Sequence, residues 1–389
     1  MADEDTVIVG AGPAGLACAA ALRVIGCRSI ILEATNSLGA SWRRHYDRLH
    51  LHTDKSHSAL PGSPMPAAFP RYPSRLQVIE YLECYARANN LRIVTDKTVA
   101  CVAKKTDWIV KTTDGDVFEA RAVVIATGLS RTPSRPHWTG QNHFPGTIIH
   151  SSEYRNASAL DAGRILVVGF GNSAGEIALE CAEADLDVAM SVRSPVNIVP
   201  REIFGVASAT IAIVQQRFPY RMVDAFNAPF LNLRYREIEE LGLKRSRQGP
   251  LTRMIEQGRT PLIDIGTIAK IGDGRIRVFP GIEMSDGASV FFADGRSAEF
   301  DAIVLATGYK PALETLLPDL TDRFSNAGRP ARDELQPGND GLYFCGFNPA
   351  TTGLLRQIGI EASQIANSIA ATARAKSFRR EGVEVAPNR

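Results

Sequence analysis

Three glycines near the start of the chain have a spacing that suits binding of a phosphate-bearing ligand. In GAGPAG, Gly10 permits a tight turn, Gly12 allows backbone NH groups to approach a pyrophosphate, and Gly15 lets a helix pack against a strand. The turn follows an apolar run and opens an Ala-rich stretch, so a helix N-terminus would face the anion. Glu33 ends the next apolar run, where a carboxylate accepts hydrogen bonds from ribose hydroxyls and repels a 2′-phosphate. This pattern predicts FAD or NAD in a first site, with a purely structural turn as the alternative.

A second turn, GFGNSAG, places Gly169 and Gly171 before Ala174, a permitted variant of the same pattern. No acid ends the strand that follows, and Arg193 stands there instead. A guanidinium can pair bidentately with a 2′-phosphate, so this site is predicted to prefer NADPH over NADH. The alternative for Arg193 is a solvated surface side chain. Two such sites imply hydride transfer from NADPH to a flavin, which makes FAD the economical assignment for the first site.

The stretches around both turns predict the same order of elements. Residues 6–34 are typical of a buried strand, a tight turn, a helix and a second buried strand, and residues 164–194 repeat this order. The segments 114–128 and 294–308 also match, because both place Asp-Gly and Ala-Thr-Gly at the same separation. Each segment is predicted to form a hairpin that leads into a buried strand.

From this duplication we predict an α/β fold with two Rossmann-like dinucleotide-binding domains, for FAD and NADPH, the second inserted into the first. The FAD-binding domain is expected to be discontinuous, over residues 1–158 and 309–389, and the NADPH-binding domain to span residues 159–308. An apolar strand at 341–347, followed by a helical pattern, indicates the return to the first domain. Residues 204–245 are predicted to be helical, and three roles remain open for them: packing, a substrate entrance or contact with a membrane surface.

Composition narrows the class of protein. The 389 residues are 44% hydrophobic and 22% charged with a formal charge of +2, which argues against disorder and against a nucleic-acid surface. The start MADEDTVIVG lacks the basic segment of an export signal, and no apolar run reaches the ~20 residues of a transmembrane segment, so a cytoplasmic location is expected. The six cysteines lack a CxxC motif and are expected to be free, and the histidine spacing does not favour a metal site. The tail at 380–389 is expected to be loose.

The stretch FPGTIIHSSEY lies between the two turns and contains Phe144, Gly146, His150 and Tyr154. With GAGPAG, GFGNSA and the ATG turns, it resembles class B flavin-containing monooxygenases, whose fingerprint is FxGxxxHxxxY/F. The segments YDRLHLHTDK, YPSRLQVIEYLECYA, VRSPVNIVPREIFG, TPLIDIGTIAKI and LATGYKP resemble the YUCCA-type members, which make auxin in plants. The likeness covers about residues 5 to 370.

The four fingerprint residues are interpreted as parts of a linker between the two nucleotide sites. Gly146 is expected to allow close approach of the backbone near the cofactor interface, while Phe144, His150 and Tyr154 hold the linker in place. Their role would be to set the relative placement of nicotinamide and flavin. Proton transfer by His150 is the alternative.

The resemblance implies a reaction sequence. NADPH reduces FAD, the reduced flavin adds O2 to form a C4a-hydroperoxyflavin, and this species inserts one oxygen atom into a small-molecule substrate while the other leaves as water. For the YUCCA-type branch the implied reaction is oxidative decarboxylation of a 2-oxo acid such as indole-3-pyruvate. The chemistry belongs to the flavin, so no Ser/His/Asp triad or metal is needed, and no nucleic-acid partner is expected.

The resemblance also assigns site residues. His52 and Asn172 are the catalytic candidates; His52 stands where animal-type members have an asparagine, and a core histidine is its alternative. The residues implied for FAD are Gly10, Gly12, Pro13, Ala14, Gly15, Glu33, Gly39, Ser41, Trp42, Leu49 and Gly346. Those implied for NADPH are Gly169, Gly171, Asn172, Ser173, Ala174, Arg193 and Ser194, with Gln77 as a further candidate. Two turns are expected near the cofactors, Thr127-Gly128 and Thr307-Gly308.

Four other functions are compatible with parts of the pattern. The same cofactors serve amine or sulfide oxygenation and Baeyer–Villiger oxidation, although Tyr154-Arg155 departs from the Baeyer–Villiger fingerprint. A pyridine nucleotide–disulfide reductase would need a redox dithiol, and the chain contains neither CxxC nor CxxxxC. A non-catalytic flavin-binding protein would show no NADPH oxidation or O2 uptake. His52 in place of asparagine speaks against oxygenation of the animal type.

Overall fold

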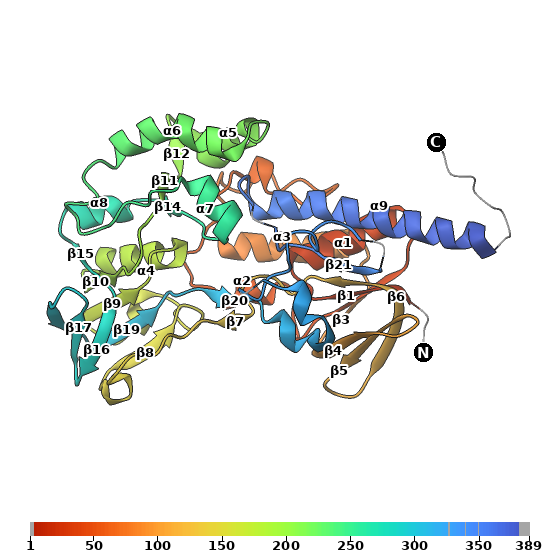
Figure 1. Cartoon of the computed structure of the whole chain (residues 1–389), viewed down its shortest axis with the longest axis horizontal. Helices are drawn as coiled ribbons and strands as arrows, with labels where there is room; N and C mark the ends of the chain where they lie inside the picture. Colours follow the sequence, from red (N-terminus) through yellow and green to blue (C-terminus); the bar gives the residue numbers. More distant parts are fainter. Residues whose placement is uncertain (1–3, 326, 339, 349, 381–389) are drawn as a thin grey trace.

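The computed structural model describes residues 4–325, 327–338, 340–348 and 350–380 (Figure 1). Beyond Arg380, where helix α9 ends, the tail that was expected to be loose lies outside the described residues. Within them, the chain forms a mixed α/β fold built on two sheets with mainly parallel strands. No helix in the described part of the chain combines the length and apolar character that a bilayer crossing needs.

The first sheet has seven strands in the order β3-β2-β1-β6-β5-β4, with β21 also paired to β6. Strands β3, β2, β1, β6 and β21 run parallel, and β5 and β4 continue the sheet as an antiparallel meander. The predicted return of the chain to this sheet is therefore confirmed by β21. The strands are β1 Glu4–Val9, β2 Ser29–Leu32, β3 Ile93–Val94, β4 Val99–Lys104, β5 Trp108–Thr112, β6 Val117–Ile125 and β21 Leu342–Phe344.

Three helices cover one face of this sheet: α1 Pro13–Val24, α3 Arg75–Ala88 and α9 Leu354–Arg380 (Figure 1). Their apolar side chains and those of the sheet form one buried core, which includes Leu16, Tyr85 and Ile358. On the opposite face, side chains of the sheet, including those of the meander strands, form a second core with the 3₁₀ turns at Leu313–Thr315 and Pro318–Arg323. Both faces are buried, as continuous apolar strands require.

The second sheet has five parallel strands in the order β15-β10-β9-β19-β8. Helices α4 Asn172–Glu183 and α8 Thr267–Gly272 pack on one face, and the antiparallel sheet β16-β17-β18 packs on the other. The strands are β8 Thr147–His150, β9 Arg164–Val168, β10 Asp187–Ser191, β15 Ile276–Phe279, β16 Ile282–Asp286, β17 Ser289–Phe292, β18 Ser297–Glu299 and β19 Ala302–Leu305.

Strand β8 changes the predicted boundary between the two parts. It pairs in parallel with β19, from Thr147 opposite Ala302 to His150 opposite Leu305, so the second sheet begins before residue 159. The boundary at 158/159 was wrong for this strand, because a short apolar run does not reveal in the sequence which sheet it joins.

The duplicated hairpin is confirmed in both halves. Around Asp114-Gly115, β5 and β6 pair antiparallel, and around Asp294-Gly295, β17 and β18 do the same. In the first copy the returning strand continues unbroken into the buried part of β6. In the second copy it is divided into β18 and the buried β19.

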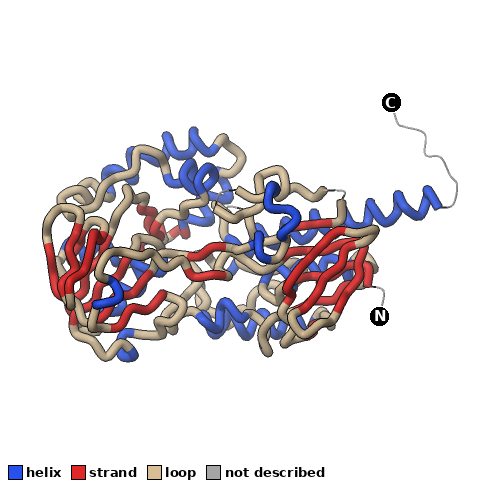
Figure 2. Tube along the Cα trace, turned by 60° about the horizontal axis from the view of Figure 1, so that its bottom comes forward, coloured by secondary structure: helices blue, strands red, loops and turns tan. Residues whose placement is uncertain are grey.

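Two crossing segments join the sheets. Strand β7 Thr132–Pro133 leaves the first sheet, β20 Tyr309–Lys310 returns to it, and the two pair antiparallel between the sheets (Figures 1 and 2). The short elements around them are α2 Ala40–Arg44 and the 3₁₀ turns Lys55–His57, Gln141–His143 and Ala157–Ala159.

The predicted helical segment is confirmed and forms a third part of the fold, above the second sheet in Figure 1. Helices α5 Ser208–Gln215, α6 Tyr220–Arg234 and α7 Pro250–Gln257 lie with the strand pairs β11-β14 and β12-β13. These strands are β11 Ile198–Pro200, β12 Glu202–Ile203, β13 Val206–Ala207 and β14 Leu262–Asp264. Several large apolar side chains here are exposed, including Phe204, Phe218 and Phe226.

Candidate functional site

A cavity of about 720 Å³ connects all three parts of the fold. Gly10 and Gly12 of the first glycine turn lie at one end, Asn172 of the second turn lies along the wall, and helices α5 to α7 line the other end. Within the described residues, no group of three or more His, Cys, Asp or Glu side chains gathers as a metal site would require.

The first turn has the geometry of a dinucleotide cradle. Gly10 has a φ of +107°, and a Cβ there would lie 2.7 Å from the Ala126 carbonyl oxygen. A Cβ on Gly15 would lie 1.9 Å from the Gly10 carbonyl oxygen, so only glycine allows α1 to start this close to the turn. A Cβ on Gly12, by contrast, would meet nothing within 4 Å. That open side faces the cavity, and the first NH groups of α1 have no side-chain cap, which leaves them available to a pyrophosphate.

Glu33 is held at the end of β2 by hydrogen bonds from the turn. Its Oε2 accepts from the Ala11 NH at 2.7 Å, and its Oε1 accepts from the Thr35 NH at 3.0 Å and the Thr35 hydroxyl at 2.9 Å. The carboxylate is buried yet lines the cavity, so its remaining lone pairs can accept from ribose hydroxyls. The donor and acceptor set of this end thus fits the adenosine part of FAD.

Most residues implied for FAD line the cavity. Thr127 is informative among them, because its buried hydroxyl oxygen has no hydrogen-bond partner in the described part of the chain, as expected for a polar atom that faces a ligand. Leu49 and Gln77 lie outside the cavity: Leu49 packs in the core around α4, and Gln77 forms a capping box with Ser74 at the start of α3. Those that line it are Gly10, Gly12, Pro13, Ala14, Glu33, Gly39, Ser41, Trp42, Thr127, Gly128 and Gly346.

The second turn repeats the geometry of the first. Gly169 has a φ of +126°, and a Cβ there would lie 2.4 Å from the Ala306 carbonyl oxygen, whereas the space at Gly171 is open. Ala174 is buried at the third position. Arg193 is exposed two residues beyond the carboxyl end of β10, and its stem lies beside Gly281. This position beside the turn is compatible with a 2′-phosphate contact.

Of the residues implied for NADPH, the structure brings Asn172 alone to the wall of the cavity. Its Oδ1 accepts from the Ile263 NH at 2.8 Å, which fixes the amide at the start of α4. The Thr307 hydroxyl donates to the Ser134 carbonyl oxygen and so fastens one crossing segment to the other. The residues that do not line the cavity are Gly169, Gly171, Ser173, Ala174, Arg193, Ser194, Thr307 and Gly308.

A polar cluster joins the segment after α2 to α4. His52 Nε2 lies 2.9 Å from Oε1 of Glu176, which is 3% exposed on α4. Tyr46 makes side-chain hydrogen bonds with Glu176 and Ser173, and burial raises the pKa of its hydroxyl. Burial lowers the pKa of the neighbouring His45 to about 4, and the Glu176 carboxylate opposes this shift in part. His45 is therefore neutral at physiological pH.

Sequence reasoning did not identify Glu176 or Tyr46. Glu176 stands four residues after Asn172 in a run of buried residues whose neighbours, such as Ile177 and Ala178, are apolar. A charged residue within such an apolar run is the signal that could have identified Glu176, because acids are rarely buried without a partner. His52 was expected to contact a cofactor or to be a core histidine; it lines the cavity and is also paired inside the protein.

The fingerprint residues hold the crossing segments against the second sheet. A Cβ on Gly146 would lie 2.0 Å from the Asp301 carbonyl oxygen, so the close approach is to the start of β19. His150 Nδ1 accepts from the Ser152 NH at 3.1 Å, which leaves Nε2 to donate to the Gly308 carbonyl oxygen at 3.0 Å. Burial lowers the pKa of His150, which favours this neutral form. The ring does not line the cavity, so these contacts support positioning more than proton transfer.

Tyr154 completes this arrangement. Its hydroxyl donates to Oε2 of Glu180 at 2.6 Å, and its ring is buried against α4. Phe144 is buried in the core on the other face of the second sheet. The linker is thus fastened on both faces of one sheet.

The far end of the cavity is largely apolar. Side chains from β11, β12 and the three helices line it, among them Ile203, Ile211, Phe230 and Met254. Arg201 also lines this end, between β11 and β12. Such a chamber suits an apolar substrate with a polar group placed at one side.

Comparison with known proteins agrees with this geometry. Residues 7–203 match the family described as pyridine nucleotide-disulphide oxidoreductase. The chain is 37% identical over 348 residues to indole-3-pyruvate monooxygenase YUCCA1 of Oryza sativa subsp. japonica, covering 88% of this chain and 86% of that protein. It is 38% identical over 349 residues to the probable indole-3-pyruvate monooxygenase YUCCA4 of Arabidopsis thaliana, covering 88% of this chain and 84% of that protein.

Solved structures share the fold. A flavin-containing monooxygenase from Stenotrophomonas maltophilia aligns with a TM-score of 0.74 at 21% identity, covering 96% of this chain and 100% of that one. An oxidized steroid monooxygenase bound to NADP aligns with a TM-score of 0.75 at 18% identity, covering 96% of this chain and 87% of that one.

Proposed function

The chain belongs to the YUCCA-type flavin-containing monooxygenases, and on that premise we propose that it oxygenates a 2-oxo acid such as indole-3-pyruvate, using FAD, NADPH and O2. Two dinucleotide-binding domains, the second inserted into the first, would hold the cofactors, FAD at the Gly10 turn and NADPH at the Gly169 turn. In the net reaction a 2-oxo acid, O2, NADPH and a proton give the acid one carbon shorter, CO2, NADP⁺ and water. One oxygen atom of O2 enters the new carboxylate and the other becomes water.

The observation that carries the proposal is the continuity of the cavity. It passes from the open side of Gly12 and from Glu33, past Asn172, to the apolar chamber formed by α5 to α7. A flavin held at the first turn, a nicotinamide near Asn172 and an apolar substrate would therefore share one enclosed space. The sequence left three roles open for residues 204–245. Because α5 and α6 line the apolar chamber, the structure supports a role in substrate binding.

When bound, FAD supplies the redox and oxygen-activating chemistry, and the protein supplies binding, orientation and a dry environment. The Gly12 turn and the α1 N-terminus hold the pyrophosphate, and Glu33 selects a ribose without a 2′-phosphate. Arg193 selects NADPH by pairing with its 2′-phosphate. His150, Tyr154 and Gly146 fix the second sheet relative to the crossing segments, which sets the distance between the two nucleotide sites.

A disulfide reductase is the main candidate from another class, because its family matches half of the chain. Such an enzyme exchanges thiols with a dithiol beside the flavin. The six cysteines are free, and none lines the cavity. The monooxygenase therefore fits the site better.

Anaerobic reduction by NADPH followed by a pulse of O2 tests the proposed function. We expect the flavin absorption to bleach with NADPH, and O2 to yield indole-3-acetate when indole-3-pyruvate is present. An alkyl amine and a simple ketone serve as competing substrates for heteroatom and Baeyer–Villiger oxygenation. Product from the amine or the ketone, with none from the 2-oxo acid, would replace the proposed substrate class, and a flavin that NADPH does not bleach would refute the enzyme assignment.

A further inference from the structure

Four arginine or lysine side chains line the cavity: Arg44, Lys97, Arg131 and Arg201. Three of them belong to the end built on the first sheet and α2. Lys97 forms ion pairs with Asp114 and Asp116, Arg131 donates to the Ala312 carbonyl oxygen, and Arg44 lies on α2. Arg201 alone belongs to the apolar end, which makes it the cation closest in the fold to a substrate chamber.

The backbone of Arg201 is fixed at the base of the β12-β13 hairpin. Its NH donates to the Asp264 carbonyl oxygen at 3.2 Å, and its carbonyl oxygen accepts from the Ser208 NH at 2.9 Å. The guanidinium carbon lies 4.4 Å from the centre of the Tyr72 ring. This stacking holds the planar group by one face and leaves its NH edge available for hydrogen bonds.

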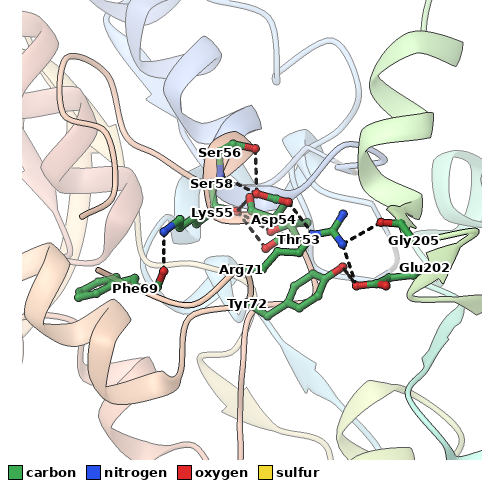
Figure 3. A network of polar contacts seen from close by, with 10 residues as sticks. All are labelled: Thr53, Asp54, Lys55, Ser56, Ser58, Phe69, Arg71, Tyr72, Glu202 and Gly205. Atoms are coloured by element: carbon green, nitrogen blue, oxygen red, sulfur yellow. Dashed lines mark hydrogen bonds and ion pairs between the residues drawn. The ribbon is translucent and has the colours of Figure 1, made fainter. Parts of the chain in front are cut away.

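Acids near Arg201 are engaged with other groups. Glu202 accepts from the Tyr72 hydroxyl at 2.7 Å and from Arg71 at 3.1 Å, as Figure 3 shows. The Asp264 carboxylate accepts from the Gly266 NH at 3.1 Å and the Tyr235 hydroxyl at 3.4 Å. In the described ranges, no carboxylate forms an ion pair with Arg201, whereas Arg71 and Lys97 each form two.

The same network positions the Tyr72 ring. Arg71 donates to Asp54 at 2.8 Å and to the Gly205 carbonyl oxygen at 2.8 Å, which ties the segment before α3 to the β12-β13 hairpin (Figure 3). Tyr72 is held between this arginine and Glu202. The Tyr72 ring on which Arg201 stacks is thus held in place by the segment before α3 and by the β12-β13 hairpin.

We propose that Arg201 binds the carboxylate of the 2-oxo acid substrate and so selects 2-oxo acids over neutral ketones of the same shape. The proposal rests on the proposed function and names the residue that recognises its substrate class. A half-buried guanidinium without an ion-pair partner, at the edge of an apolar chamber, suits an anion whose remaining part is apolar. Ile211, Phe230 and Met254 would contact the apolar side chain of the substrate. Tyr72 acts as a positioning residue for the guanidinium.

The test compares dissociation constants in the flavin-loaded enzyme and its Arg201→Met variant. The probes are indole-3-acetate, indole-3-pyruvate and the neutral indole-3-acetone, and binding is followed by the change in flavin absorption. Loss of a charge-assisted hydrogen bond should weaken both carboxylates about 10- to 100-fold and the ketone no more than about threefold. Arg217→Met, at an exposed position in the α5–α6 connection, removes the same charge and should change none of the three constants.

Equal weakening of acids and ketone, no weakening in Arg201→Met, or no preference of the unaltered enzyme for the acids would each overturn the carboxylate assignment. Product formation decides the proposed function separately. Binding of indole-3-acetate that depends on Arg201, without turnover of indole-3-pyruvate, would refute the reaction and keep the anion site. An unchanged kcat/KM for indole-3-pyruvate in Arg201→Met would keep the reaction and remove the anchor.

Tyr72 provides a second measurement. Tyr72→Ala should raise the KM for indole-3-pyruvate by about tenfold with little change in kcat, because it removes the platform but no reacting group. Tyr72→Phe keeps the ring face and should restore most of the affinity. If the phenylalanine variant is as weak as the alanine variant, the ring does not position Arg201.

Discussion

His52 Nε2 lies 2.9 Å from Glu176 Oε1, and this contact crosses from the segment after α2 to the first turns of α4. His52 is 17% exposed and Glu176 is 3% exposed, so the pair is largely shielded from water. Neither atom has another partner within the described part of the chain, so each is the polar contact of the other. The pair therefore joins the segment after α2 to α4, the helix that begins at the second glycine turn.

A double-mutant cycle on this pair should show strong coupling. His52→Ala removes one of the two polar partners of the buried carboxylate, the other being Tyr46, and should lower the free energy of unfolding by about 3 kcal/mol. Glu176→Gln should cost less in the His52→Ala background than alone, with a coupling of about 1 to 3 kcal/mol. Urea unfolding of the flavin-loaded protein, followed by circular dichroism, measures the free energy of unfolding of the unaltered protein, the two single variants and the double variant. Additive effects would show that the two side chains are independent.

Gly12→Val should give a folded protein that does not retain flavin. A Cβ at Gly12 meets no atom within 4 Å, so the fold itself accepts a side chain, but the space it would fill is where a pyrophosphate must approach. The absorption spectrum of the purified protein reports flavin, and circular dichroism reports folding. Gly15→Val is the contrasting variant, because its Cβ would lie 1.9 Å from the Gly10 carbonyl oxygen and folding itself should fail. A yellow Gly12→Val protein would contradict the first-site assignment.

Arg193→Ala should raise the apparent KM for NADPH by about 10- to 100-fold and leave that for NADH nearly unchanged. The reason is that the 2′-phosphate is the group that distinguishes the two cofactors, and Arg193 is the exposed cation beside the second turn. Steady-state oxidation of each cofactor measures the effect. Equal changes for NADPH and NADH would show that Arg193 does not read the phosphate.

His45 should make stability depend on pH between about 4 and 6.5, because burial lowers its pKa to about 4 from a usual 6.5. Above this window the His45 ring is neutral in both the folded and the unfolded chain. As the pH falls through 6.5 the unfolded chain takes up a proton first, so the free energy of unfolding falls, by about 2 kcal/mol at pH 5. Below about pH 4 the folded form is protonated too, and the loss levels off.

His45→Gln should remove most of this loss between pH 7 and pH 5, as measured by urea unfolding of the flavin-loaded protein. Part of the slope should remain, because burial also lowers the pKa of His150. His137→Gln, at an exposed position, should leave the profile as it is. An unchanged profile in His45→Gln would show that this ring is not the group that titrates.

Local patterns in the sequence were sufficient to predict the two glycine turns and the two hairpins. The spacing of Gly10, Gly12 and Gly15 requires one backbone path, since Gly10 and Gly15 each allow a close backbone contact and Gly12 leaves an open side. The position of Glu33 was predictable from the end of the apolar run that forms β2. The two hairpins were predictable from the Asp-Gly turns and their equal separation from Ala-Thr-Gly. Such features are set by backbone sterics over short distances, which is why they were predictable.

Tertiary structure decided which distant residues meet. The membership of β8 in the second sheet, the contact of His52 with Glu176 and the stacking of Arg201 on Tyr72 join segments that are far apart in the chain. The apolar end of the cavity likewise depends on how α5, α6 and α7 pack over the second sheet. Local propensity carries no information about such contacts, because they arise when separate elements bury their apolar faces together. The sequence by itself thus determined the two glycine turns, and packing alone decided the chamber, the position of Arg201 in it and the buried contact of His52 with Glu176 on α4.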